Sequence, residues 1–335
     1  MQIKEVFLQE EKERVISFLS KLNLKYSDDI TKTFYIVNES DDIVGTISCA
    51  NNIIKDLGVD EAYQGENISS LLVGQMITYF RENNIFSYQV FTKPKYVSVF
   101  ESFGFREIVK SDNVAMLEGG LDKIEDEINK IKKVLELNFS PLESADLGCV
   151  VLNANPITNG HVYLIEEALK KNKNLVVFIV EEDKSVFSFK ERLSLAYLAT
   201  KRFNNVYVMP SSKYVVSSLT FPDYFLKNAS EKAKENAIID ALIFKNYFMK
   251  YLHINKRYVG TEQDEYMKIY NNSLKEVLND NLEIVDRLKE DSEIVSAKKV
   301  RKLFEEGKIG EALKYCPNEC SLVLRSIAMV KYGSK

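Results

Sequence analysis

The chain has no excess of basic residues and no long apolar run. It carries 45 lysine and arginine residues against 49 aspartate and glutamate residues, and its net charge of −4 provides no global positive field for nucleic acid or anionic lipid. No segment approaches the roughly 20 apolar residues of a membrane span. The first residues, "MQIKEVFLQEEKERVISFL", have neither the basic start nor the apolar core of a signal peptide. We therefore expect a cytoplasmic protein that binds neither nucleic acid nor membranes.

Cysteine and histidine are both scarce. Cys49 and Cys149 lie in apolar segments, where a thiol behaves as a small hydrophobe. Cys316 and Cys320 have a C-x3-C spacing, but no second pair and no nearby histidine completes a zinc site. Of the two histidines, His253 lies beside hydrophobic and basic residues and is expected to be structural. The sequence thus predicts reduced thiols and no metal bound by side chains.

A length of 335 residues exceeds what one hydrophobic core usually supports, so we expect two domains. Residues 1–118 alternate short apolar strands with helices, a pattern typical of an α+β domain. The candidates are "TFYIV", "IVGTISCA", "NIIKDLGV", "ISSLLVGQMITYFREN", "SYQVFT", "YVSVFESFG" and "VAMLEGG". Residues 119–146 are expected to form a connecting helix or linker, and residues 147–335 the second domain.

The connecting segment has a single apolar stripe. Leu121, Ile124, Ile128, Ile131 and Leu135 recur at intervals of three and four among charged residues, which is the spacing of one helix face. The stripe can pack on the adjoining domain or recruit a partner. We favour packing on the domain.

The second domain alternates strands with helices. The strand candidates are "GCVVLNA", "NLVVFIVEE", "NVYVMPS", "ALIFKN", "KRYVGTEQ" and "NLEIVDRLK". Apolar strands joined by crossover helices predict a doubly wound parallel sheet covered on both faces, and such sheets bind ligands beyond the carboxyl ends of their strands. The fold class is therefore α/β, with an α+β domain first.

The remaining histidine follows the first of these strands, in "VVLNANPITNGHVYLIEEAL". Pro156 and Gly160 bracket a tight loop, and the next helix directs unsatisfied backbone N–H groups back into it. His161 at the helix start can add a positive or hydrogen-bonding imidazole, and Thr158 a hydroxyl. This arrangement suits a phosphate group whose charge grows during a reaction.

The stretch "TNGH", preceded by "NANPI", resembles the (Thr/His)-x-Gly-His signature of the nucleotidylyltransferase superfamily, whose members bind ATP on a Rossmann-like sheet of the HUP type. A second signature, Ile-Ser-x-x-x-(Ile/Val)-Arg, is matched by "VSAKKVR", residues 295–301. Ser296 has the character of a helix N-cap, and Arg301 can reach back from the helix.

The resemblance implies roles for individual residues. His161 and Thr158 are expected to act on the α-phosphate, and Ser296 and Arg301 on the β- and γ-phosphates. The other residues expected to contact the nucleotide are Asn153, Asn155, Pro156, Gly160, Lys184, Gly260 and Thr261. Gly260 and Thr261 would approach adenine or ribose through their backbone.

Two further groups were interpreted as structural. Arg192 is expected to pair with a carboxylate and hold its helix. Ser217, Ser218 and Thr220 are interpreted as ordinary capping residues before a helix, with the lining of an acetate or pantetheine pocket as the alternative.

Longer blocks resemble the citrate lyase ligase family: "GCVVLNANPITNGHVYLIEEA", "YVVSSLTFPDYFLK", "RYVGTEQ" and "VSAKKVR" occur in that order. The resemblance implies an ATP-dependent acid–thiol ligase. It would use acetate to acetylate the coenzyme-A-like thiol prosthetic group on the acyl-carrier subunit of citrate lyase, through an acetyl-adenylate. AMP and diphosphate would be released, with Mg²⁺ bridging the phosphates.

The first domain is similar to the GNAT acetyltransferase fold, through "VDEAYQGENISSLLVGQMI" and "FTKPKYVSVFESFGFREI". Such domains bind the coenzyme A diphosphate with backbone amides of a (Gln/Arg)-x-x-Gly-x-(Gly/Ala) turn. Gln64 and Gly65 fit the approach to this turn, whereas Asn67 and Ser69 replace the two small residues. Because Asn adopts left-handed angles readily, we expect the turn to survive and to hold the prosthetic group without acetyl transfer from acetyl-CoA.

Two other functions remain open. One is an adenylyltransferase of the phosphopantetheine or nicotinamide mononucleotide type fused to an accessory domain. The other is a non-catalytic regulator that binds coenzyme A.

Overall fold

The computed structural model describes residues 1–182, 185–215, 221, 226, 228–290 and 293–333. The chain forms two compact units. The first unit comprises Met1–Asp126 and Phe221–Glu235, and the second comprises Glu127–Thr220 and Asn236–Lys335. Lys184, Ser217, Ser218 and Thr220 lie outside the described residues.

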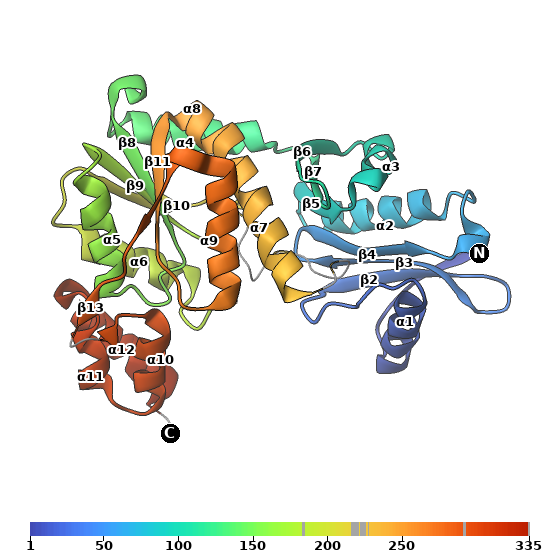
Figure 1. Ribbon diagram of the computed structural model, residues 1–335. Coiled ribbons are helices and arrows are strands. Elements are labelled where there is room, and N and C mark those ends of the chain that lie inside the picture. The colour runs from blue at the N-terminus through green and yellow to red at the C-terminus, as the bar shows by residue number, and fades with distance from the viewer. Residues whose placement is uncertain (183–184, 216–220, 222–225, 227, 291–292, 334–335) are drawn as a thin grey trace. The chain divides into compact units, whose positions relative to one another are not determined.

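The first unit is built on a seven-stranded mixed sheet in the order β1-β2-β3-β4-β5-β7-β6, in which only β4 and β5 pair in parallel. Its strands are β1 (Gln2–Glu5), β2 (Lys32–Val37), β3 (Ile43–Ala50), β4 (Ile53–Val59), β5 (Ser87–Thr92), β6 (Arg106–Lys110) and β7 (Ala115–Gly120). Its helices are α1 (Gln9–Lys21), α2 (Ile68–Glu82) and α3 (Val97–Ser102). Helices α1 and α2 cover opposite faces of this sheet (Figure 1).

The segment from Phe221 belongs to this unit. The ring of Phe221 packs edge-on against Phe91, with centroids 5.6 Å apart. The carboxylate of Glu235 accepts a hydrogen bond from Asn113 Nδ2 at 2.7 Å and another from the Ser111 hydroxyl. The first sheet is thus covered in part by residues that come more than a hundred positions later in the chain.

Strand β4 carries an irregularity at Asp56. The pairing of β3 with β4 shifts register between Thr46 and Ser48, and Asp56, opposite this shift, has a φ of +53°. The Asp56 side chain is fully buried, and in the described part of the chain neither of its carboxylate oxygens makes a hydrogen bond of ordinary geometry, although the Ser48 side chain and the Ser27 backbone are near enough to lower its pKa. Burial raises the pKa of Asp56 to about 7, opposed by the charge of neighbouring Lys55, which is paired with Asp29.

The second unit contains a five-stranded parallel sheet in the order β10-β9-β8-β11-β12. Its strands are β8 (Leu147–Leu152), β9 (Asn174–Ile179), β10 (Val206–Pro210), β11 (Ile254–Gly260) and β12 (Leu282–Val285). Two short strands, β13 (Lys289–Glu290) and β14 (Glu293–Ile294), pair separately. Because β8 lies between β9 and β11, the chain reverses its direction across the sheet at β8, where ligands of such folds bind.

Helices cover both faces of this sheet. Its helices are α4 (Ile124–Glu136), α5 (Asn159–Leu169), α6 (Phe189–Thr200), α7 (Ala229–Ile243), the π-helix η4 (Phe244–Met249), α8 (Lys250–Leu252), α9 (Glu265–Leu278), α10 (Ala297–Glu305), α11 (Ile309–Lys314) and α12 (Ser321–Tyr332). The neighbours Arg257 and Tyr258 on β11 mark the two faces, since successive strand residues point in opposite directions. Tyr258 donates to Asn172 beyond α5 at 2.6 Å, and Arg257 pairs with Asp240 of α7 at 2.7 Å.

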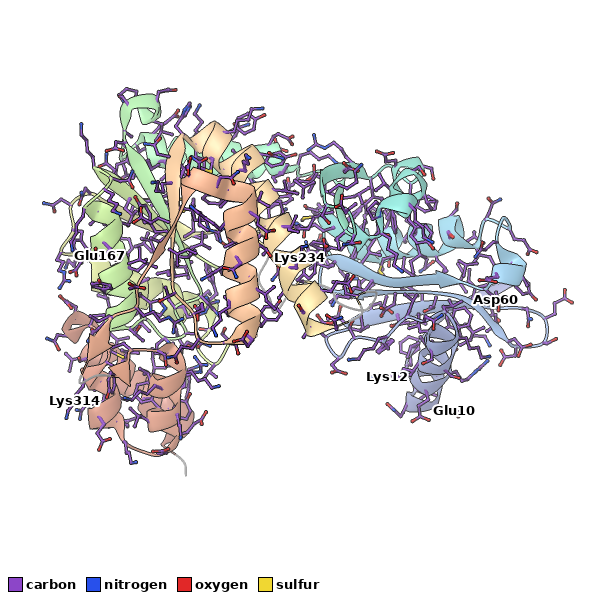
Figure 2. The ribbon with its side chains drawn as sticks, in the orientation of Figure 1. Glu10, Lys12, Asp60, Glu167, Lys234 and Lys314 are labelled. Carbon is purple, nitrogen blue, oxygen red and sulfur yellow. The ribbon has the colours of Figure 1, made fainter. Side chains whose placement is uncertain are left out.

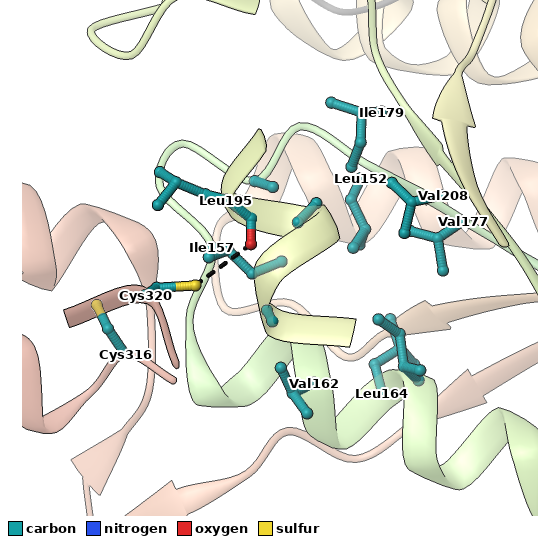
Figure 3. Close-up of a cluster of buried hydrophobic side chains, with 14 of the residues drawn as sticks. Leu152, Ile157, Val162, Leu164, Val177, Ile179, Leu195, Val208, Cys316 and Cys320 are labelled. Atoms are coloured by element: carbon teal, nitrogen blue, oxygen red, sulfur yellow. Dashed lines mark hydrogen bonds between the residues drawn. The ribbon is translucent and has the colours of Figure 1, made fainter. Parts of the chain in front are cut away.

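The helices at the end of the chain pack on the α5 and α6 side. Cys316 and Cys320 are buried in the same apolar cluster as Ile157 and Leu195, and the Cys320 thiol donates to the Leu195 carbonyl at 3.3 Å (Figure 3). All four cysteines are free thiols. Helices α10 to α12 therefore share one core with the first strand of the sheet.

Charged side chains of both signs cover the surface, for example Glu10 and Lys12 on α1, Glu167 on α5 and Lys314 on α11 (Figure 2). Among the helices that the described residues form, none combines the length and apolar character needed to cross a membrane.

The structure corrects two expectations. "ALIFKN" is not a strand, since residues 241–246 continue from α7 into η4. The prediction failed because this part of the helix is buried, and over a few residues a buried helix and a buried strand have the same apolar pattern. In the predicted stripe of α4, Ile124, Ile128, Ile131 and Leu135 are buried, whereas Leu121 precedes the helix and is 78% exposed.

Candidate active site

The loop after β8 is fixed by a buried arginine. Arg192 of α6 is fully buried and donates to the carbonyls of Asn153 at 2.8 Å, Val180 at 2.9 Å and Phe187 at 3.1 Å. It also donates to the Glu182 carbonyl, and its guanidinium lies 3.7 Å from the Glu182 carboxylate. The expected carboxylate pairing is present, but Arg192 mainly ties the loops that follow β8 and β9 to each other.

Side chains of the loop add to this connection. Asn155 Oδ1 accepts from the backbone N–H of Phe187 at 3.0 Å, and Asn153 Nδ2 donates to the Ser185 hydroxyl at 3.3 Å. Ala154 between them is buried at a φ of +50°, an uncommon conformation for a residue with a Cβ. Both asparagine side chains therefore stabilise the conformation of the loop, in addition to any contact that they make with a ligand.

Helix α5 begins with Thr158 as its N-cap, and His161 occupies the third position. The backbone N–H of Thr158 donates to His161 Nδ1 at 3.0 Å, and the Thr158 hydroxyl lies 2.9 Å from the same nitrogen. Because a backbone N–H can only donate, Nδ1 is an acceptor, and in the neutral ring the proton is on Nε2. His161 therefore offers an N–H from Nε2.

The imidazole of His161 is neutral at physiological pH. Desolvation by the surrounding protein, with a smaller effect from the positive charge of Arg287, lowers its pKa to about 4. Of the two states expected from the sequence, hydrogen-bonding or positively charged, the structure supports the first.

The second motif lies against the first. Ser296 is the N-cap of α10, as expected, and its hydroxyl accepts from the Lys299 N–H at 3.2 Å. A Cβ placed on Gly160 would lie 3.3 Å from the Val295 carbonyl oxygen, so the absence of a side chain lets α5 approach the start of α10. Arg301 of α10 donates to the Asn155 carbonyl. The segments that contain "TNGH" and "VSAKKVR" are therefore in contact.

Two residues of this edge have no counterpart in our sequence predictions. Arg287 follows β12, and its backbone N–H donates to the Thr261 hydroxyl at 3.2 Å. Its guanidinium is ion-paired with Glu262, which follows β11. Burial raises the pKa of Glu262, opposed by the charge of Arg287. The one sequence feature that points to Arg287 and Glu262 is their position near the carboxyl ends of two predicted strands.

Gly260 and Thr261 have backbone partners within the fold. The Thr261 N–H donates to the Val285 carbonyl at 2.8 Å, and the Gly260 carbonyl accepts from Asn271 Nδ2 at 2.9 Å. The contact of these two residues with adenine or ribose stays a prediction. It would have to use backbone groups that these hydrogen bonds do not occupy.

The remaining predicted residues lie elsewhere. Pro156 is in the loop between Asn155 and the start of α5, and Lys184 is outside the described residues. His253 ends α8 with a φ of +54° and lies 3.5 Å from the Glu143 carboxylate, a position that fits a structural residue. Within the residues that the structure describes, no three His, Cys, Asp or Glu side chains are grouped so that they would hold a metal ion.

A pocket of about 380 Å³ lies on the outer face of α5, between this helix and the C-terminal helices. Asn159, Tyr163, Arg202 and Lys314 are among its lining residues, whereas His161, Ser296 and Arg301 are not. The motif residues and the N-termini of α5 and α10 instead lie together at the carboxyl edge of the sheet, which is the candidate site.

In the first unit, the turn before α2 has the backbone expected of it. Asn67 is the N-cap of α2 and adopts left-handed angles, with φ +59° and ψ 13°. Gly65 has a φ of +95°, which favours glycine, and both Gln64 and Gly65 are exposed. The prediction that asparagine preserves the turn is confirmed.

Comparison with known proteins agrees with this architecture. Residues 147–322 match the family described as citrate lyase ligase C-terminal domain, and residues 4–117 match the acetyltransferase (GNAT) domain. The chain is 29% identical to the citrate (pro-3S)-lyase ligase of Haemophilus influenzae over 95% of this chain and 96% of that protein. It is 31% identical to that of Escherichia coli K12 over 74% of this chain and 69% of that protein.

The first unit is also similar to a solved acetyltransferase of the GNAT family from Staphylococcus aureus, with 21% identity and a TM-score of 0.30 over 36% of this chain and all of that one. The family match in the second unit covers the strands, loops and helices that carry both nucleotide motifs. The chain therefore belongs to the citrate lyase ligase family, and it is a ligase with a GNAT-like unit followed by a parallel-sheet unit.

Proposed function

We propose that the protein is an acid–thiol ligase that acetylates the thiol prosthetic group of the citrate lyase acyl-carrier subunit, using acetate and ATP. The observation that carries this proposal is the convergence of His161, Ser296 and Arg301 at one edge of the sheet, in a member of the citrate lyase ligase family. ATP and the carrier thiol are the substrates that such a site and such relatives favour.

The reaction has two steps. In the first, an oxygen of acetate attacks the α-phosphorus of ATP, the bond to the diphosphate breaks, and acetyl-adenylate forms. In the second, the thiol sulfur attacks the acetyl carbonyl, its proton passes to solvent, and AMP leaves. Neither step needs a protein nucleophile, so the work of the site is to position and stabilise charged oxygens.

Each motif residue has a defined task. The Nε2–H of His161 donates to an α-phosphate oxygen, and the hydrogen bonds from Thr158 to Nδ1 hold the ring in the required tautomer. The N-terminus of α10 with Ser296 and the guanidinium of Arg301 bind the β- and γ-phosphates. Mg²⁺ bound with ATP would supply further positive charge, held mainly by phosphate oxygens. Asn153, Asn155, Pro156, Gly160 and Lys184 complete the loops around the nucleotide.

In the first domain, residues 1–118, the turn at Gln64 and Gly65 would bind the coenzyme-A-like group of the carrier. The left-handed Asn67 supports this because its side chain does not cap the amides at the start of α2. Residues 119–146 connect it to the ligase domain, residues 147–335. The absence of binding between the full-length protein and dephospho-CoA or the loaded carrier would reduce the first domain to a scaffold.

The test is to mix the full-length protein with ATP, Mg²⁺, acetate and deacetylated citrate lyase, and to measure AMP and diphosphate. We expect both products only when acetate and the thiol are present. His161→Ala should reduce AMP formation by about 10²- to 10³-fold, the usual cost of one donor to a developing oxyanion. His253→Ala is the matched control and should leave the rate unchanged.

The outcomes separate the alternatives. An adenylyltransferase of the phosphopantetheine or nicotinamide mononucleotide type would retain AMP in its product and would ignore acetate. A protein that binds coenzyme A without catalysis would release no diphosphate from ATP. Either result would replace the proposed function.

A further inference from the structure

The neutral state of His161 determines what the imidazole can contribute. A neutral ring donates a hydrogen bond through Nε2 but brings no full positive charge. A triphosphate and an approaching carboxylate place several negative charges near one another, and in a partly buried site these need cationic partners. A cation beside His161 would meet this need and would also keep the ring neutral, because two adjacent positive charges repel.

Arg287 lies at the same carboxyl edge of the sheet, after β12. Its Cγ and Nε would lie 3.7 and 3.9 Å from a Cβ placed on Gly260, so the side chain lies over the end of β11. Its backbone is held by the hydrogen bond to Thr261. The guanidinium is close enough to His161 to lower the pKa of the imidazole.

Glu262 restrains this arginine without using all of its donors. The ion pair joins Arg287 Nη2 to Glu262 Oε2, and the two side chains are only 27% and 20% exposed. A guanidinium has five N–H groups, so one carboxylate contact leaves others for a second anion. Because both side chains are mostly buried, the ion pair fixes the position of the guanidinium before a ligand binds, unlike an ion pair on the exposed surface.

We propose that Arg287 is a phosphate-binding residue of this site, contacting the same phosphate group as His161, and that Glu262 is a positioning residue that holds the guanidinium over Gly260. The identity of that group as the α-phosphate of ATP rests on the proposed function. His161 supplies a directed hydrogen bond, and Arg287 supplies the charge that the neutral ring does not carry.

The first test is ATP binding to the full-length protein, measured by calorimetry with Mg²⁺ and without acetate. Arg287→Gln should weaken ATP binding by about tenfold or more, the usual effect of losing one charged hydrogen bond. Arg287→Lys, which keeps the charge but loses the planar fork, should give a smaller loss. The matched control is Arg202→Gln: Arg202 is also ion-paired, to Glu166 at 2.6 Å, and is 49% exposed.

A loss of less than about twofold for a folded Arg287→Gln protein would overturn the proposal, since even a weak charged contact exceeds this. If Arg287→Gln does not fold, Arg287→Lys takes its place, and an ATP affinity equal to that of the unmodified protein overturns the proposal. If the unmodified protein binds no ATP, the proposed function fails instead, so the two failures are distinguishable.

The second test follows the imidazole directly. The chain has only two histidines, so His253→Gln leaves the His161 resonances alone in the imidazole region of an NMR spectrum. Adding Arg287→Gln should raise the pKa of His161, because a nearby positive charge has been removed. Arg202→Gln should leave it unchanged, and no rise in the Arg287→Gln protein would contradict the placement of the guanidinium.

The role of Glu262 is tested by a double-mutant cycle. Glu262→Gln alone should weaken ATP binding, because the guanidinium is no longer held in place, although less than Arg287→Gln does. In the Arg287→Gln background the same substitution should have no further effect. Equal losses in both backgrounds would show that Glu262 does not act through Arg287.

Discussion

Asp56 in the first unit and His161 in the second are both titratable side chains whose pKa burial shifts in favour of the neutral form, but their surroundings differ. His161 accepts a hydrogen bond on Nδ1, and the loops around it are fixed by Arg192. Asp56 makes no hydrogen bond of ordinary geometry among the described residues, although Ser48 and Ser27 lie near it, and it has a left-handed backbone conformation. One site is internally satisfied, and the other retains an unsatisfied group.

Burial therefore has different consequences for the two side chains. A ring that is neutral and hydrogen-bonded is preorganised, because a ligand finds its donor already oriented. A buried carboxyl group without partners costs free energy in either protonation state, and such groups persist where the surrounding structure imposes them. The imidazole of His161 is therefore held in one orientation, whereas β4 holds a buried carboxyl group at a left-handed backbone position.

The largest effect is expected from Arg192→Met, which leaves buried carbonyls after β8 and β9 without a donor. We expect a loss of about 3 kcal/mol or more in the free energy of unfolding, because each unsatisfied buried acceptor costs about 1–3 kcal/mol. Calorimetry of the full chain measures it. Arg202→Met, at a half-exposed arginine, should cost less than about 1 kcal/mol. Similar losses for both would show that Arg192 does not hold the loops after β8 and β9 together.

A smaller effect should come from His161 in acid. Its folded-state pKa of about 4 lies below the ordinary value of 6.5, so between these values the unfolded chain binds a proton that the folded chain does not. Stability is therefore complete above pH 6.5 and falls as the pH decreases toward 4, by no more than about 3 kcal/mol. His161→Gln keeps an acceptor for the Thr158 N–H and should lose less stability over this range. An identical acid dependence in both proteins would contradict the pKa.

Asp56 should show the opposite pH dependence. Its folded-state pKa of about 7 lies above the ordinary value of 3.8, so stability falls as the pH rises through this window and remains lower above it. Asp56→Asn, which is neutral throughout, should stabilise the β3–β4 region by about 1 kcal/mol at pH 8, less than the full shift because the amide also needs partners. Hydrogen exchange of peptides from β3 and β4 measures this.

The control for that experiment is Asp60→Asn, at a partly exposed residue whose carboxylate caps a short helical turn and whose role an amide can assume. It should change exchange in β3 and β4 little at any pH. A gain from Asp56→Asn that is equal at pH 4.5 and pH 8 would exclude titration as its cause.

The smallest effect is expected at Asn67. Replacing it with glycine removes the steric cost of a left-handed residue, and the folded first unit should gain up to about 0.5 kcal/mol, reduced by the greater freedom of glycine in the unfolded chain. Asn83→Gly at the other end of α2, where φ is −99°, should only lose stability. Thermal unfolding of the two variants compares them, and a loss at both positions would mean that Asn67 is unstrained.

The parts of the site that depend on local sequence were predictable. Thr158 and His161 are three residues apart at a helix start, so their hydrogen bond follows from helix geometry, and Ser296 is an N-cap for the same reason. The left-handed angle of Asn67 follows from its place in a short motif. Such features need only the few residues around them.

Features that depend on register were not predictable in this way. Arg287 and Glu262 meet because β11 and β12 pair in parallel with Gly260 opposite Val285, and the sequence contains no local sign of that register. The bulge at Asp56 interrupts a strand that otherwise has an ordinary pattern. The prediction of a strand at residues 241–246 was wrong for a related reason. The short apolar run contains no sign that the residues before and after it form a helix.

The hydrogen bond between Arg301 and the Asn155 carbonyl spans 146 positions of the chain. The loop after β8 and helix α10 can therefore meet only after the residues of both have been synthesised and the sheet between them has formed. If these two segments hold the nucleotide as proposed, a protein truncated before α10 keeps "TNGH" but lacks the second half of the site.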